Sequence, residues 1–117
     1  MQDLERIISY SFKDKDLLRT ALTHSSYSRE MHSYCPYNER LEFLGDAFLD
    51  AIIGEELFRM FPREEEGFLS KARASLVCEK SLAKKAREIG LGSKLLLGHG
   101  ESKAGGRRRD SILADAM

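Results

Sequence analysis

One segment, Asn38 to Phe61, constrains the fold more than any other, because apolar residues recur through it at helical spacing. One set of these residues continues for about six turns along the helix: Leu41, Leu44, Phe48, Ala51, Ile52 and Leu57. Others fall on the remaining faces: Phe43, Ala47, Leu49 and Ile53. Pro62 should end the helix, because it cannot donate the next backbone hydrogen bond. A helix that is apolar on several sides is normally buried, and we expect this one to be the central element of the fold.

The rest of the chain also reads as helices, with no stretch of convincing strand alternation. Weaker helical patterns lie at about 3–11, at about 14–26, at 68–77 and at 81–89. Asp14 or Asp16 would cap the start of the second of these helices, and Gly90 would end the fourth in a left-handed conformation. One helical turn is expected at 95–97, and a last helix starts near 112. Two segments read as loops, a polar one at 24–37 and an exposed glycine-rich and basic one at 98–110. The predicted fold class is therefore all-α.

The length of 117 residues suits one small domain, and we expect residues 1–117 to form a single unit. Apolar residues make up 42% of the chain and charged residues 32%, which favours a folded globular protein. The two cysteines are far apart in sequence and suggest neither a disulfide framework nor a zinc site. No apolar run is long enough to cross a membrane, and the first residues do not resemble a secretory signal. We expect a cytoplasmic protein without a membrane partner.

The formal net charge of zero hides an uneven distribution of charge along the chain. Up to Glu66 there are 8 basic and 14 acidic residues, whereas the remainder has 11 basic and 5 acidic residues. One acidic centre and one basic surface on the same domain would suit a metal-dependent enzyme that acts on a polyanion.

Carboxylates interrupt the apolar helix at regular intervals. Glu39, Glu42 and Asp46 are spaced by three and four residues, so they lie on one helical face, and Asp50 continues the stripe. Neighbouring anions repel one another, and more strongly when apolar side chains exclude water. The repulsion can be offset by water and basic partners such as Arg40, or by a divalent cation such as Mg²⁺. Spacing alone leaves both interpretations open.

Four motifs in order resemble the ribonuclease III family of double-stranded-RNA endonucleases. They are LTHSSY at 22–27, NERLEFLGDAFLD at 38–50, FPREEEGFLSKARASLV at 61–77 and LGHGESKAGGRRRDSILADA at 97–116. The resemblance covers nearly the whole chain and implies the all-α endonuclease-domain fold. It also implies hydrolysis of phosphodiester bonds, leaving 5′-phosphate and 3′-hydroxyl ends, in the maturation of ribosomal, messenger and other structured RNAs.

The resemblance assigns roles to five acidic residues. Glu42 matches a metal-ligand glutamate, Asp46 matches an aspartate essential for catalysis, and Asp115 matches a second metal ligand from a later helix. Glu39 and Glu66 match two further acidic residues that line the same cavity. The implied cofactor is Mg²⁺, with Mn²⁺ as a substitute.

The resemblance also implies two kinds of partner. The basic residues Lys103, Arg107, Arg108 and Arg109 are expected to contact the phosphates of double-stranded RNA. Recognition of duplex shape and 2′-hydroxyl groups is expected, and not base readout. Members of the family act as homodimers, and Phe43 matches an aromatic residue that inserts into the partner subunit.

The sequence departs from the family pattern at its end. The pattern has a metal-ligating glutamate three residues after the aspartate matched by Asp115, at position 118, followed by about two more helices and in most members a double-stranded-RNA-binding domain. We therefore expect this sequence to be part of a longer protein, and expect little or no activity from a chain that truly ended at Met117. Two alternatives stay open: a catalytically impaired module for RNA binding or dimerisation, and, ranked last, an all-α nucleotide pyrophosphohydrolase, whose paired-glutamate motif is absent.

Overall fold

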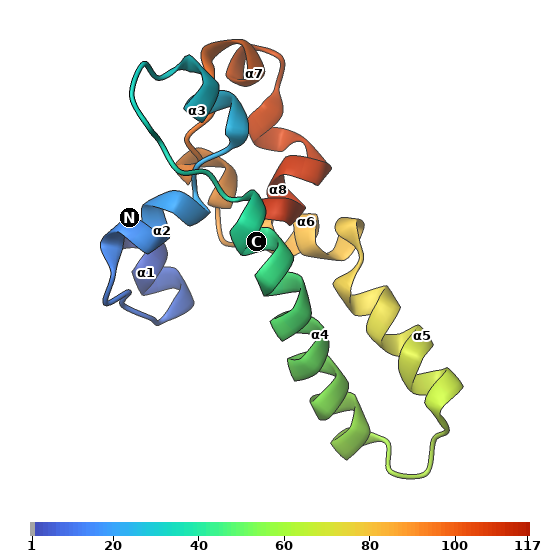
Figure 1. Ribbon diagram of the computed structural model, residues 1–117. Helices are drawn as coiled ribbons and strands as arrows, with labels where there is room; N and C mark the ends of the chain where they lie inside the picture. The colour runs from blue at the N-terminus through green and yellow to red at the C-terminus, as the bar shows by residue number, and fades with distance from the viewer. Residues whose placement is uncertain (1) are drawn as a thin grey trace.

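The computed structural model describes residues 2–117, which form a helical body and a two-helix arm that projects from it (Figure 1). The elements in order are α1 (Gln2–Ile8), α2 (Lys15–Ala21), α3 (Ser25–Glu30), α4 (Glu39–Met60), α5 (Glu66–Val77), α6 (Glu79–Glu88), the 3₁₀ helix η1 (Leu91–Lys94), α7 (His99–Lys103), the 3₁₀ helix η2 (Gly106–Arg108) and α8 (Asp110–Ala116). We call α4 and α5 the arm, and the remaining elements the body. Within residues 2–117 there is no β-strand, only one isolated bridge between Thr23 and Leu96, so the all-α prediction is confirmed.

The core lies in the body and joins the two ends of the chain. Leucines from α1 and α2 pack with α6, η1 and α8, and the members of this cluster are Leu4, Leu18, Leu22, Ala83, Ala86, Leu91, Leu95, Leu97, Ile112 and Leu113. Ala83 and Ala86 are fully buried on α6. Their small side chains let α8 approach α6 closely, and this contact brings the last helix into the centre of the body.

Two predicted helix boundaries are confirmed in atomic detail. The Asp14 side chain accepts hydrogen bonds from the N–H groups of Asp16 and Leu17, and so caps the N-terminus of α2. After α6, Gly90 adopts a left-handed conformation with φ of 69°, which favours glycine because it lacks a Cβ. Both residues therefore end or begin helices by the mechanism expected from their chemistry.

The arm is an antiparallel helical hairpin with a short turn at its far end. The turn begins at Phe61 and Pro62, where α4 can no longer continue. The rings of Phe61 and Phe68 pack edge to face with centroids 5.2 Å apart and close the tip. At the other end, Asn38 donates its backbone N–H to the carbonyl oxygen of Thr23 at 2.9 Å, which fixes the start of α4 to the body.

The expectation that α4 is the central, buried element is wrong. Leu57 is its one buried residue, and a row of large apolar side chains lies exposed along it: Phe43, Leu44, Phe48, Ile52 and Phe58. The radius of gyration is 15.9 Å, compared with about 13 Å for a compact chain of this length. The exposed apolar side chains of α4 are therefore not buried by other described residues of the same chain. No helix of residues 2–117 is long and apolar enough to span a membrane.

Three segments differ locally from the predictions. Residues 25–30 form α3 inside the expected polar loop, because Nδ1 of His24 accepts the N–H of Ser26 and caps the helix. Residues 95–97 are not a helical turn; Leu96 is extended and exchanges hydrogen bonds with Leu22 and His24. The expected glycine-rich loop contains α7 and η2. These elements are too short to show apolar periodicity, so the sequence carries little signal for them.

Candidate active site

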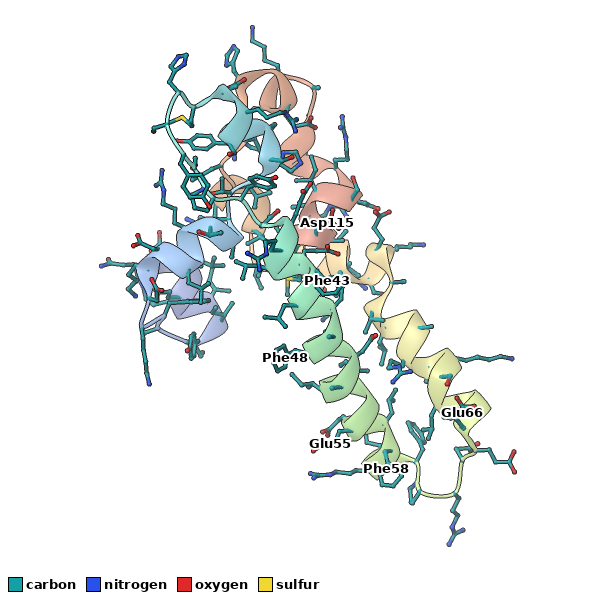
Figure 2. All side chains as sticks on the ribbon, viewed as in Figure 1. Phe43, Phe48, Glu55, Phe58, Glu66 and Asp115 are labelled. Carbon is teal, nitrogen blue, oxygen red and sulfur yellow. The ribbon has the colours of Figure 1, made fainter. Side chains whose placement is uncertain are left out.

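Three carboxylates lie around one cavity at the junction of the arm and the body. Glu42 and Asp46 from α4 and Asp115 from α8 line one cavity of about 370 Å³, together with the amide of Asn38. Apolar residues from α2, α4, α6 and α8 form the rest of the wall. Figure 2 shows Asp115 beside the root of α4. We call this space the carboxylate cavity.

The helical register of α4 decides which polar residues reach the cavity. Asn38, Glu42 and Asp46 are four residues apart and lie on one face. Gly45 also lines the cavity, and a Cβ placed on it would meet no atom within 4 Å, so the space beside the carboxylates is open. Glu39, which was expected to line the same cavity, lines a separate one together with Phe43, and its expected role stays a prediction.

The last helix is held firmly enough to present Asp115. Ile112, Leu113 and Ala114 are buried against the body, which leaves Asp115 on the side of α8 that faces α4. At the start of α8, the guanidinium of Arg87 pairs with the Asp110 carboxylate. The packing of three consecutive residues thus fixes the position of a carboxylate that is 69 residues away from Asp46 in sequence.

The carboxylates perturb one another because they lie close together. Hydrogen bonding with Asp46 raises the pKa of Glu42, and partial burial and the negative charges of Asp46, Asp115 and Glu39 add to this rise. Loss of hydration raises the pKa of Asp115, with a further contribution from the charge of Asp46, whereas His24 acts in the opposite direction. The ionised forms of Glu42 and Asp115 are therefore disfavoured, and a positive charge in the cavity would stabilise them.

Basic side chains do not supply that charge. Within residues 2–117, no Lys or Arg pairs with Glu42, Asp46 or Asp115 within 4.0 Å. The oxygen-only donor set suits a hard divalent cation. No three acidic, His or Cys side chains of the described chain converge closely enough to enclose a metal. Such an open arrangement fits Mg²⁺, which keeps several waters and uses few carboxylates.

Glu66 does not reach the carboxylate cavity within one chain. It begins α5 at the far end of the arm, where it lines a different cavity with Asp50, Glu55 and Arg73 (Figure 2). The Ser70 hydroxyl donates to its carboxylate at 2.8 Å. The reason is geometric: the sequence after α4 must turn at Pro62, so the start of α5 faces the end of α4, and not its beginning, where Glu42 lies. The role expected for Glu66 stays a prediction.

The basic segment is more structural than expected. Arg107 is half-buried and donates to the carbonyl oxygens of Leu95 at 2.6 Å and Gly92 at 3.1 Å. Arg109 pairs with Glu101 at 2.7 Å. Lys103 and Arg108 are exposed and form no ion pair within residues 2–117.

Two glycines of this segment are required for packing. A Cβ on Gly98 would lie 2.7 Å from the carbonyl oxygen of Ser26, and one on Gly106 would lie 2.7 Å from Cγ of Glu101. The segment is therefore folded against the body, and the expectation of a wholly exposed loop is wrong.

Phe43 projects from α4 into solvent, with 78% of its surface exposed. It lines a wide cavity of about 960 Å³ with Tyr34, Tyr37 and Leu44. Figure 2 shows Phe43, Phe48 and Phe58 spread along the length of α4. The side chain is thus available for contact with another molecule.

One residue of the site, Asn38, is absent from the set predicted above. The carboxylate stripe was defined by acidic residues, and a neutral amide does not belong to that class. The signal that identifies it is its register, four residues before Glu42 and eight before Asp46.

Comparisons with known proteins agree with this architecture. The family model described as Ribonuclease-III-like matches residues 14–117. Ribonuclease 3 of Caldanaerobacter subterraneus subsp. tengcongensis is 58% identical over 114 residues, which cover 97% of this chain and 50% of the relative. Ribonuclease 3 of Idiomarina loihiensis is 50% identical over 117 residues, covering 100% of this chain and 48% of the relative. The chain thus spans about half the length of the curated relatives it matches.

Solved structures agree as well. One crystal structure of the nuclease domain of ribonuclease III from Campylobacter jejuni is 51% identical, covers 99% of this chain and 76% of its own, and has a TM-score of 0.89. A second structure of that domain, described in terms of flexibility in a region involved in dimer formation, has a TM-score of 0.91 at 51% identity over 98% of this chain and 77% of its own. Because the matched residues include the helices that carry Glu42, Asp46 and Asp115, sequence, fold and site agree, and the chain belongs to the ribonuclease III family.

Proposed function

We propose that residues 1–117 form the nuclease domain of a metal-dependent endonuclease that hydrolyses phosphodiester bonds in double-stranded RNA. The observation that carries the proposal is that Glu42, Asp46 and Asp115 line one cavity in a chain of this family. The products would carry 5′-phosphate and 3′-hydroxyl ends. Precursors of ribosomal and messenger RNA are the substrates we propose for the whole protein.

The residues in and beside the carboxylate cavity would have different roles in this reaction. Glu42 and Asp115, from different helices, would hold a divalent cation, Mg²⁺ or Mn²⁺ in its place. The chemistry that such a cation supplies is activation of water and neutralisation of charge on the phosphate. Asp46 lies close enough to Glu42 to raise its pKa, and the Asp46 carboxylate would orient the attacking water by accepting a hydrogen bond from it. Glu39 adds negative charge felt by Glu42 and Asp115 from outside the cavity wall.

The internal contacts of the basic segment narrow the proposed RNA contacts. Lys103 and Arg108 are exposed and lack an ion-pair partner, so they are the residues of the segment that we propose for phosphate binding. Arg107 and Arg109 would act indirectly, by fixing the segment on the body through Leu95 and Glu101.

We further propose that the chain forms a homodimer through the exposed apolar side of α4. Large apolar side chains that lie contiguously in water are unusual for a monomer and are typical of an interface. Phe43, Leu44, Phe48, Ile52 and Phe58 are all exposed, and they are spread over most of the length of the helix. An isologous pairing would cover each copy's face with the same face of the other.

The test of the nuclease proposal is cleavage of a labelled double-stranded RNA by the protein that carries this chain, with Mg²⁺ and with a chelator in its place. Asp46→Asn removes a charge with little change in shape, and should reduce turnover by at least about 100-fold while leaving the helical circular dichroism unchanged. Asp50→Asn, on the same helix but outside the carboxylate cavity, is the matched control and should keep most of the activity.

The outcomes separate the proposal from its alternative. Cleavage that needs Mg²⁺ and Asp46 supports the nuclease. Binding of RNA without any cleavage by the wild-type protein would favour the impaired module. Equal turnover by wild type and Asp46→Asn would remove Asp46 from the mechanism.

A further inference from the structure

The amide of Asn38 is a polar group in the carboxylate cavity whose use inside the chain is incomplete. Asn38 is 6% exposed, and it lines the carboxylate cavity together with Glu42, Asp46 and Asp115. A side chain buried to this degree normally satisfies its hydrogen-bonding groups within the protein. The hydrogen-bond partner of each polar group of Asn38 therefore indicates which group is free to act in the cavity.

Three of the four polar groups of Asn38 have partners. Its backbone N–H donates to Thr23 at 2.9 Å, its backbone carbonyl accepts the N–H of Glu42 at 2.8 Å, and Nδ2 donates to the carbonyl oxygen of Ala21 at 3.1 Å. The amide cannot be turned over, because Oδ1 would then face another carbonyl oxygen. The orientation of the side chain is thus fixed by its anchor on Ala21.

The fourth group, Oδ1, accepts no hydrogen bond from residues 2–117 and is not a fully buried atom, so it is open to water. Asparagine at the position before a helix usually uses this oxygen to accept an N–H of the first turn, which stabilises the helix. Asn38 precedes α4 and makes no such side-chain bond. The oxygen therefore lacks its ordinary local role, in a residue that lines the carboxylate cavity together with Glu42.

We propose that Oδ1 of Asn38 is part of the cation site, where it accepts a hydrogen bond from a water in the hydration shell of the bound cation. This inference rests on the function proposed above. Mg²⁺ gives up its waters reluctantly, so the protein must orient several of them with hydrogen-bond acceptors. A neutral amide oxygen can do this without adding to the mutual repulsion of Glu42, Asp46 and Asp115. Asn38 is thus a positioning residue, and its anchor on the body sets the direction of the acceptor.

The test is calorimetric titration of the whole chain with Mn²⁺ and with Mg²⁺. Asn38→Leu removes both the acceptor and the bond to Ala21, whereas Asn38→Asp removes the bond but keeps an acceptor. We expect Asn38→Leu to bind the cation about 10-fold more weakly than wild type, and Asn38→Asp to bind it at least as tightly as wild type. Urea denaturation without the cation should show a loss of stability in both variants, because both lose the bond to Ala21, and a larger loss in Asn38→Asp at neutral pH, because its carboxylate adds to the repulsion of the acidic residues. Asp50→Asn is the control and should leave cation affinity unchanged.

Several results would overturn the inference. A purely structural role predicts that Asn38→Asp, which loses the bond to Ala21 as Asn38→Leu does, also loses cation affinity despite its added charge. Affinity of Asn38→Leu within twofold of wild type would show that the oxygen has no part in the site. Should Asn38→Leu not fold, a fall of more than fivefold in Asn38→Asp would refute the acceptor role by itself.

Glu42→Gln distinguishes a failure of this inference from a failure of the proposed function. A loss of affinity in Glu42→Gln but not in Asn38→Leu would reject only the role of Asn38. Unchanged affinity in both variants would reject the cation site itself.

Discussion

Replacement of Phe43 by Ala tests whether the exposed side of α4 is an interface. Complete burial of a Phe side chain stabilises by about 1.5–3 kcal/mol. Because 78% of Phe43 is exposed in one chain, about 1–2 kcal/mol of this is available to association. A symmetric dimer buries two copies, so the substitution should cost about 2–5 kcal/mol of dimer stability, or roughly 30-fold to a few thousand-fold in the dissociation constant.

Sedimentation equilibrium over a range of protein concentrations measures this change. Ile7→Ala is a suitable control, because Ile7 is 54% exposed but lies on α1, away from the arm, and its removal should leave the dissociation constant unaltered. The monomer itself should lose less than about 1 kcal/mol in Phe43→Ala, since little of the ring is buried within one chain. A wild-type chain that stays monomeric at tens of micromolar, or a dissociation constant that Phe43→Ala changes by less than threefold, would refute the reasoning.

Two further predictions concern the basic segment and the effect of acid. Arg107→Ala should lower the free energy of unfolding by about 1–3 kcal/mol in urea denaturation, because two backbone carbonyls lose a charged donor. Arg108→Ala should change that free energy by less than about 0.5 kcal/mol, and should instead weaken RNA binding and reduce its salt slope by about one; equal losses of stability in both variants would contradict the division of roles. Hydrogen bonds from the Lys15 side chain and the Phe12 N–H lower the pKa of Glu5, so its ionised form stabilises the fold above the ordinary glutamate pKa of about 4.3. This contribution should disappear as the pH falls through the lowered pKa, and Glu5→Gln should be less stable than wild type at pH 7 but not at the acid end of the titration.

Elements with strong local signals could be predicted from the sequence, and their arrangement could not. The boundaries of α4, α5, α6 and α8 follow from apolar periodicity together with Pro62 and Gly90. The position of α4 was wrong because periodicity reports that a face is apolar, and does not say what covers it. No part of residues 2–117 covers the exposed apolar side chains of α4. The helix therefore has the apolar pattern of a buried helix although it lies at the outside of the fold.

The candidate site shows a similar division. Spacing alone places Glu42 and Asp46 on one face of α4, whereas Asp115 entered the prediction only through the family resemblance. The Arg107 side chain donates hydrogen bonds to the backbone carbonyl groups of Gly92 and Leu95. Because every residue carries such a carbonyl group, the sequence could not identify these two as its partners. Local sequence therefore identifies the chemistry of side chains better than it identifies their partners.

The way the core joins both ends of the chain has a consequence for synthesis on the ribosome. Leu4 and Leu18 belong to the same cluster as Leu113, so the body cannot close until nearly all of these residues have emerged. The contacts between α4 and α5 lie close together in sequence, and this hairpin can form earlier. During translation the exposed apolar side chains of α4 would then contact water before the body has folded. A nascent chain in this state is a natural client for chaperones, and pairing of two chains on one messenger would shorten the exposure.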